Sequence, residues 1–120
     1  MVNGLSRTRD DRARISVIQQ AVAYVFDIHV DEINKPTRGS AQASLARQVA
    51  MYLAHVGLEM SLTRVGLAFG RDRTTAAYAC HKVEDRRDDP EFDNKLDELE
   101  ACIRSMPEPV VDRHQTGLAA

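Results

Sequence analysis

The feature that most constrains the fold is a very short break between two helical patterns, the Gly-Arg-Asp of residues 70–72. Before it, residues 62–69 carry apolar side chains at helical spacing, and Ser61 can cap this helix. After it, residues 73–86 predict a second amphipathic helix with Asp72 as its N-cap. A short helix, a tight glycine turn and a second helix predict a helix-turn-helix.

Further helical patterns lie on both sides of this motif. Residues 12–26 and 42–56 repeat apolar side chains at steps of three and four, and an acidic amphipathic pattern runs over residues 90–105 from Pro90. Between the first two, residues 27–40 contain Asn, Pro and Gly, which predicts a connection whose apolar residues point inward and whose end is an exposed basic loop.

Together these patterns predict an all-α fold, a compact bundle of about five helices. No segment alternates between apolar and polar residues as a strand does, and 120 residues suffice for one domain. We place the domain at residues 12–105, with flexible ends at 1–11 and 106–120.

The net charge of −2 conceals an uneven distribution. Residues 35–87 hold nine Lys and Arg against four Asp and Glu, whereas residues 88–109 hold two against eight. A basic middle segment beside an acidic end favours a surface that attracts a polyanion.

Several functional classes are disfavoured. No stretch approaches the ~20 apolar residues of a membrane span, and no secretory signal is evident, so we expect a cytoplasmic, nucleoid location and no membrane partner. Cys80 and Cys102 lack metal or redox spacing and are predicted to be buried free thiols. Adjacent Cys80 and His81 diverge on a helix and form no dyad. We expect no metal, no cofactor, no small-molecule substrate and no catalytic residue.

The start of the second helix of the motif carries side chains suited to DNA. In a helix-turn-helix this end enters the major groove. Thr74 and Thr75 each offer a hydroxyl and a methyl group, while Arg71 and Arg73 can bind phosphates or guanine. Asp72 can accept from a cytosine amine, although capping is its primary expected role. The same residues would also suit an ordinary capped helix with solvated arginines, so composition and spacing leave both readings open.

Residues 45–86, LARQVAMYLAHVGLEMSLTRVGLAFGRDRTTAAYACHKVEDR, resemble the C-terminal DNA-binding domain, domain IV, of the bacterial chromosomal replication initiator DnaA. The likeness has three ordered blocks: Arg-Gln before an Ala-Met-Tyr-Leu helix, Ser-Leu-x-x-x-Gly-x-x-Phe-Gly, and Arg-Asp-x-Thr-Thr followed by Ala-Cys-x-Lys. Weaker similarity extends the match to roughly residues 12–104. The resemblance implies a Trp repressor-like helix-turn-helix and a sequence-specific partner, double-stranded DNA.

The resemblance also assigns roles by position. Arg47 and Gln48 match a pair whose arginine reaches the phosphate backbone or the edge of the DNA site, and Ser61 and Leu62 match a helix start that lies against the backbone. Arg64 is a further phosphate candidate. The residues predicted to contact DNA are Lys35, Arg38, Arg47, Gln48, Ser61, Leu62, Arg71, Asp72, Arg73, Thr74, Thr75 and Lys82.

Two departures from the family pattern concern the DNA contacts. DnaA usually has Gly-Gly-Arg-Asp-His-Thr-Thr at the turn, whereas this chain has one glycine fewer and Arg73 in place of the histidine. The basic loop before the long helix offers only Lys35 and Arg38, so either minor-groove reading is weaker here or Arg38 performs it from a shifted position.

A third departure concerns the kind of protein. The nucleotide-binding pattern GxxxxGK[ST] of DnaA is missing from the sequence, which predicts a free-standing, monomeric regulator of replication initiation or transcription at DnaA-box-like sites. The alternative is an interaction adaptor that keeps the fold and contacts DnaA or another replication protein through its acidic last helix or its apolar faces.

Overall fold

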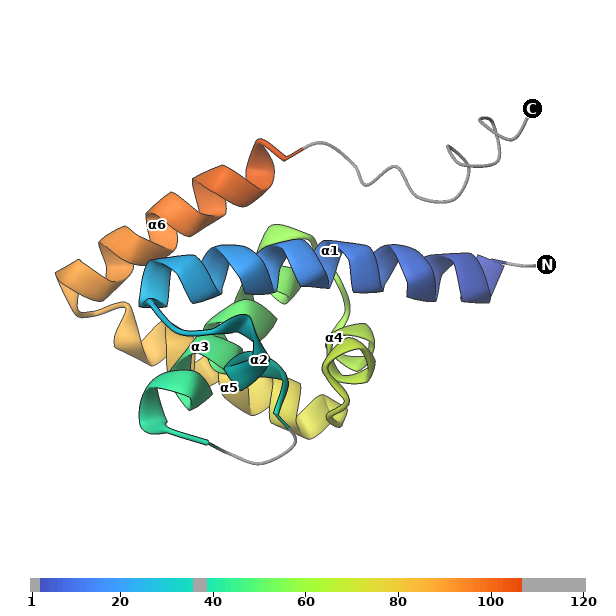
Figure 1. Ribbon diagram of the computed structural model, residues 1–120, viewed down its shortest axis with the longest axis horizontal. Coiled ribbons are helices and arrows are strands. Elements are labelled where there is room, and N and C mark those ends of the chain that lie inside the picture. The colour runs from blue at the N-terminus through green and yellow to red at the C-terminus, as the bar shows by residue number, and fades with distance from the viewer. Residues whose placement is uncertain (1–2, 36–38, 107–120) are drawn as a thin grey trace.

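The computed structural model describes residues 3–35 and 39–106, with side chains from Asp10 onward, and these residues form helices and no strand (Figure 1). The all-α prediction is confirmed. The elements are α1 (Asn3–Phe26), α2 (Val30–Asn34), α3 (Ala41–Tyr52), the π-helical turn η1 (Leu53–Gly57), α4 (Leu62–Phe69), α5 (Arg73–Arg86) and α6 (Pro90–Arg104). None of the helices in these ranges is both long and apolar enough to cross a membrane.

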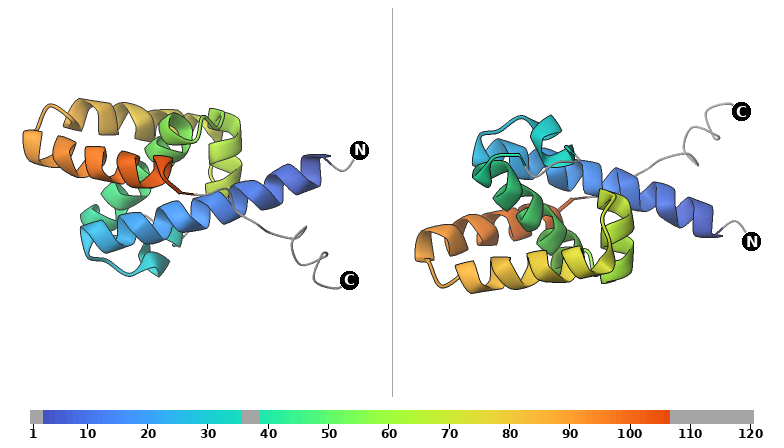
Figure 2. Two further views of the ribbon diagram at one scale, coloured as in Figure 1. Left: turned by 90° about the horizontal axis from the view of Figure 1, so that it is seen from above. Right: turned by 90° about the horizontal axis from the view of Figure 1, so that it is seen from below.

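The core is centred on α3, which lies between α1 and α5 in both views of Figure 2. Val49 and Ala50 of α3 are fully buried, as are Ile18 of α1 and Val83 of α5. Alanines on the buried face of α3 allow its neighbours to approach closely, and this helix is the centre of packing.

The short helix α2 lies where we predicted a connection. Its N-cap is His29, whose Nδ1 accepts a hydrogen bond from the backbone N–H of Asp31 at 3.2 Å. Ile33 is almost fully buried and attaches α2 to the core, as the inward apolar residues of this segment had suggested. Five residues span little more than one helical turn, so the sequence shows no repeat from which to predict a helix.

The first helix begins earlier than residue 12, at Asn3. The segment before Arg12 is polar and shows no apolar repeat, which is why the pattern did not reveal it. One contact that orders this part is tertiary: Asp11 is buried at 6% exposure and bonds Arg64 of α4.

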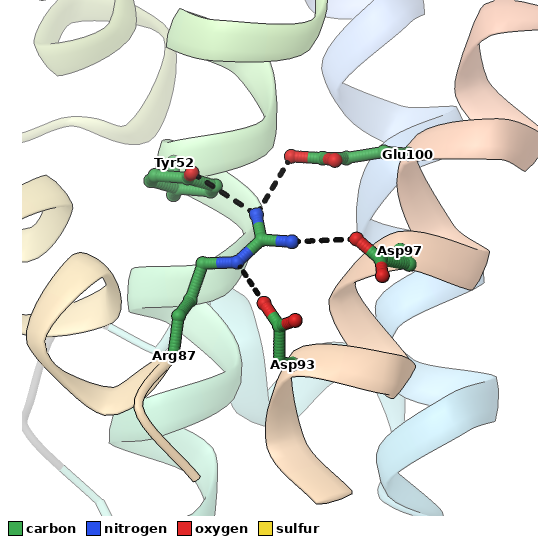
Figure 3. A network of polar contacts seen from close by, with 5 residues as sticks. All are labelled: Tyr52, Arg87, Asp93, Asp97 and Glu100. Carbon is green, nitrogen blue, oxygen red and sulfur yellow. Dashed lines mark hydrogen bonds and ion pairs between the residues drawn. The ribbon is translucent and has the colours of Figure 1, made fainter. Parts of the chain in front are cut away.

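The acidic helix α6 is attached to the bundle by Arg87, which follows α5 (Figure 3). The guanidinium of Arg87 donates to Asp93, to Asp97 at 2.7 Å and to Glu100 at 2.9 Å, and also to the hydroxyl of Tyr52 at 3.1 Å. Burial disfavours its charge, but the bonds to Asp93, Tyr52 and Glu100 outweigh burial and raise the pKa of Arg87. Part of the acidic charge of α6 therefore has an internal partner.

Candidate nucleic-acid interface

The turn between α4 and α5 brings two backbones into contact. Gly70 ends α4 in the left-handed conformation, with φ 68°, as expected for a glycine C-cap. The N–H of Arg71 donates to the carbonyl of Gly66 at 2.8 Å. A Cβ atom at Gly66 would lie 2.9 Å from backbone atoms of Arg71 and Asp72. The angle between the two helices thus depends on a glycine inside α4 as well as on the one in the turn.

Asp72 is the N-cap of α5, as predicted. Its Oδ1 accepts a hydrogen bond from the backbone N–H of Thr75 at 2.8 Å. This bond favours the charged carboxylate and lowers the pKa of Asp72. The carboxylate is therefore committed to ordering the first turn of the helix, and a contact with a cytosine amine would compete with that role.

The first turn of α5 presents its polar side chains to solvent. Arg73, Thr74 and Thr75 are all exposed. Ala76 and Ala79, which follow along the same helix, are buried against the core. Small apolar residues therefore hold the helix against the bundle, while an arginine and two threonines are exposed at its N-terminal end.

Lys35 and Arg71 lie far apart in the sequence, and the structure brings them together. Nη2 of Arg71 donates to the backbone carbonyl of Lys35 at 3.1 Å. The ammonium of Lys35 pairs with Glu32 at 3.1 Å, in a setting where both side chains are partly exposed. Exposed pairs of this kind are typically worth about 0–1 kcal/mol, so a phosphate can compete for the ammonium. Arg38, the other basic residue of this loop, lies outside the described residues.

Arg47 does not occupy the position that the resemblance implied. Its side chain is only 6% exposed, and its guanidinium donates to the carbonyl of Ile33 at 2.7 Å and to that of Glu32 at 3.0 Å. Burial, and then the positive charge of Arg71, lowers its pKa. In this structure the group attaches the end of α2 to α3, and the phosphate contact of Arg47 stays a prediction.

Arg64 is likewise engaged inside the molecule. Its Nε and Nη2 both donate to the carboxylate of Asp11, the first at 3.0 Å, and this hydrogen bonding raises the pKa of Arg64. A two-point arginine–carboxylate pair with a buried acid is stronger than an exposed pair. In this structure Arg64 joins α4 to α1, and its phosphate contact stays a prediction.

The remaining predicted residues take varied positions. Ser61 caps α4 through its hydroxyl, which accepts from the N–H of Arg64 at 3.2 Å. Gln48 on α3 and Leu62 at the start of α4 are half-buried, whereas Lys82 is exposed on α5, two turns beyond Thr74. Fewer residues therefore face solvent around the start of α5 than were predicted to contact DNA.

The two cysteines differ in their surroundings. Cys80 is half-buried on α5, and burial, followed by the charge of Glu84, raises the pKa of its thiol to about 11. Cys102 is exposed, so the predicted burial of this thiol is wrong. Residue 102 lies beside the buried stripe of α6, next to Ile103, and the helical repeat alone did not separate the two positions.

Helices α4 and α5 are joined through Gly70, and the start of α5 exposes Arg73, Thr74 and Thr75. This arrangement defines a helix-turn-helix protein of the DNA-binding class. The model of the bacterial DnaA protein helix-turn-helix matches residues 15–83. The chain belongs to this family, as the resemblance indicated.

Individual relatives agree with this assignment. The chain is 37% identical over 103 residues to the chromosomal replication initiator protein DnaA of Symbiobacterium thermophilum, a match that covers 84% of this chain and 22% of that protein. It is 35% identical over 99 residues to DnaA of Treponema denticola, covering 81% of this chain and 21% of that one. A solved structure described as a DNA replication initiation factor superposes with a TM-score of 0.72 at 31% identity, covering 85% of this chain and 32% of that chain. The chain therefore spans about a fifth of the length of these curated relatives.

Proposed function

We propose that this chain is a sequence-specific double-stranded DNA-binding protein that regulates replication initiation or transcription at DnaA-box-like sites. The observation that carries the proposal is the exposed first turn of α5, where Arg73, Thr74 and Thr75 face solvent while Ala76 and Ala79 hold the helix against the core. A helix start shaped in this way fits the major groove end first.

The exposed residues divide into two roles. We assign base reading to Arg73, Thr74 and Thr75, because an arginine fork can pair with guanine and a threonine methyl group can contact thymine. We assign phosphate contacts to the basic residues around the turn and along α5, namely Lys35, Arg71 and Lys82, with Arg38 retained from the sequence. The buried Arg47 and the paired Arg64 are left out of this set.

Replacing Arg73 by Ala tests the base-reading role. We expect the ratio of affinities for a preferred duplex and a random-sequence duplex to fall about 5- to 100-fold, because a two-point contact with guanine contributes about 1–3 kcal/mol of discrimination. Fluorescence anisotropy with the two labelled duplexes at one salt concentration measures this ratio. Since Arg73 is exposed, the melting temperature should not change. Equal losses on both duplexes would remove Arg73 from base reading.

The alternative function, an adaptor that contacts DnaA or another replication protein, has less support. Its main sequence feature was the acidic last helix, and three acids of α6 bond Arg87 of the same chain. A pull-down against DnaA, repeated after nuclease treatment, separates the two functions. Association that survives nuclease would favour the adaptor, and association that is lost would favour DNA binding.

A further inference from the structure

The exposed stripe of α5 continues beyond its first turn. Residues four apart lie on one face of a helix, so Thr74, Tyr78 and Lys82 form a row, and all three are exposed. Ala76, Ala79 and Val83 form the buried face on the other side. Figure 2 shows α5 along an outer edge of the bundle.

Tyr78 is unusual on this row because it is a large ring with 58% of its surface exposed. The Nζ atom of Lys82 lies 5.8 Å from the centroid of the ring, within the range of a cation–π contact. The contact holds an aromatic ring and a positive charge together on the same face as Thr74. A tyrosine of this kind offers an apolar body and a hydroxyl that can donate, which suits a surface with both apolar and charged parts.

The distances along the helix place this pair at the edge of the groove. With a rise of about 1.5 Å per residue, Tyr78 lies about 6 Å and Lys82 about 12 Å beyond Thr74. The major groove is about 8.5 Å deep. A helix that enters end first with Thr74 at its tip therefore holds Tyr78 beside the wall of the groove and Lys82 at its rim, where the sugar–phosphate backbone lies.

Acidic residues limit how far along α5 a contact with DNA can extend. The residues that follow are Glu84 and Asp85, both exposed. Asp85 lies on the same face as Thr74 and Tyr78, and its carboxylate would repel a phosphate. The face of α5 that is compatible with DNA thus ends after Lys82.

We propose that Tyr78 is a DNA-backbone contact, whose hydroxyl donates to a phosphate oxygen and whose ring packs on deoxyribose, with Lys82 supplying charge beside it. This inference rests on the proposed function of α5 as the recognition helix. A contact of this kind adds affinity and fixes orientation without reading sequence.

The test compares Tyr78→Phe and Tyr78→Ala with the wild type on a preferred and on a random-sequence duplex. We expect Tyr78→Phe to weaken binding to both duplexes about 2- to 10-fold, because it removes one hydrogen bond, and Tyr78→Ala to weaken both further. Lys82→Met should reduce the slope of log affinity against log salt by about 1, whereas Tyr78→Phe should leave the slope unchanged. Tyr24→Ala is the matched control, since Tyr24 is 87% exposed on α1.

Intrinsic fluorescence gives a second measurement. The chain has no Trp and three Tyr, and Tyr52 is buried at 4% exposure. In the variant Tyr24→Phe the exposed emitter is Tyr78, so addition of duplex DNA should change the tyrosine emission. An emission that stays constant while anisotropy reports binding would contradict contact at Tyr78.

The outcomes distinguish a failure of the Tyr78 contact from a failure of the proposed DNA-binding function. Wild-type affinity of Tyr78→Ala for both duplexes would overturn the inference and leave the proposed function standing. A loss confined to the preferred duplex would also overturn it, because Tyr78 would then read a base. Failure of the wild-type protein to bind any duplex would remove the proposed function as well.

Discussion

Replacing Gly66 by Ala is expected to destabilise the protein by about 2–4 kcal/mol and to lower its melting temperature by about 10 °C or more. The added Cβ would lie 2.9 Å from the carbonyl oxygens of Arg71 and Asp72 and from the carbonyl carbon of Asp72. These are backbone atoms, which cannot rotate away as the end of a side chain can. Relief requires α5 to move away from α4, so DNA binding should weaken together with stability.

Two other glycines provide matched controls for this substitution. At Gly57 an added Cβ would meet only Cγ2 of Ile103 at 3.7 Å, an ordinary contact, so Gly57→Ala should leave the melting temperature nearly unchanged. At Gly70 there is open space, but φ is +68°, so Gly70→Ala should cost about 1 kcal/mol through backbone strain. Thermal unfolding monitored by circular dichroism ranks the stabilities of the three glycine variants. A Gly66→Ala protein as stable as Gly57→Ala would contradict the close approach of the two helices.

Replacing Arg47 by Met is expected to cost about 2–3 kcal/mol of stability. The substitution keeps an unbranched chain but removes the donors to the carbonyls of Ile33 and Glu32, which leaves polar groups in or near the core without these partners. Helix α2 should detach first, because it is short and depends on this attachment.

The same substitution at an exposed arginine is the control. Arg73→Met should leave the melting temperature unchanged, since Arg73 faces solvent. Thermal unfolding and anisotropy on both variants distinguish the two roles of Arg47. If Arg47→Met melted like the wild type while binding both duplexes more weakly, that result would support the phosphate contact implied by the family resemblance and contradict the buried role.

The sequence predicts the elements whose signals are local. Ser61 and Asp72 were identified as caps, and Gly70 as a helix end, because the residue that caps and the helix that it caps are neighbours in the chain. The helix-turn-helix prediction followed from these three positions, because a short helix, a tight glycine turn and a capped second helix are its local signals. Thr74 and Thr75, which their place at the helix start suggested for DNA contact, are exposed in the structure.

The sequence does not predict roles that depend on distant partners. As arginines near the motif, Arg47 and Arg64 are candidate phosphate ligands in the sequence. Only the folded chain shows that Arg47 bonds the end of α2 and that Arg64 bonds Asp11. A buried arginine and an exposed one look the same in a sequence. Likewise, Tyr78 has no motif of its own, and it becomes a candidate only when its exposure and its contact with Lys82 are known.

The central claim is that the exposed start of α5 reads the sequence of double-stranded DNA. Selection of bound duplexes from a random pool, followed by sequencing, tests it without assuming a target site. We expect the wild-type protein to enrich one short motif, and Arg73→Ala to lose preference at one position of that motif while other positions keep theirs. No enrichment over the starting pool at low salt, with the protein folded, would contradict the claim.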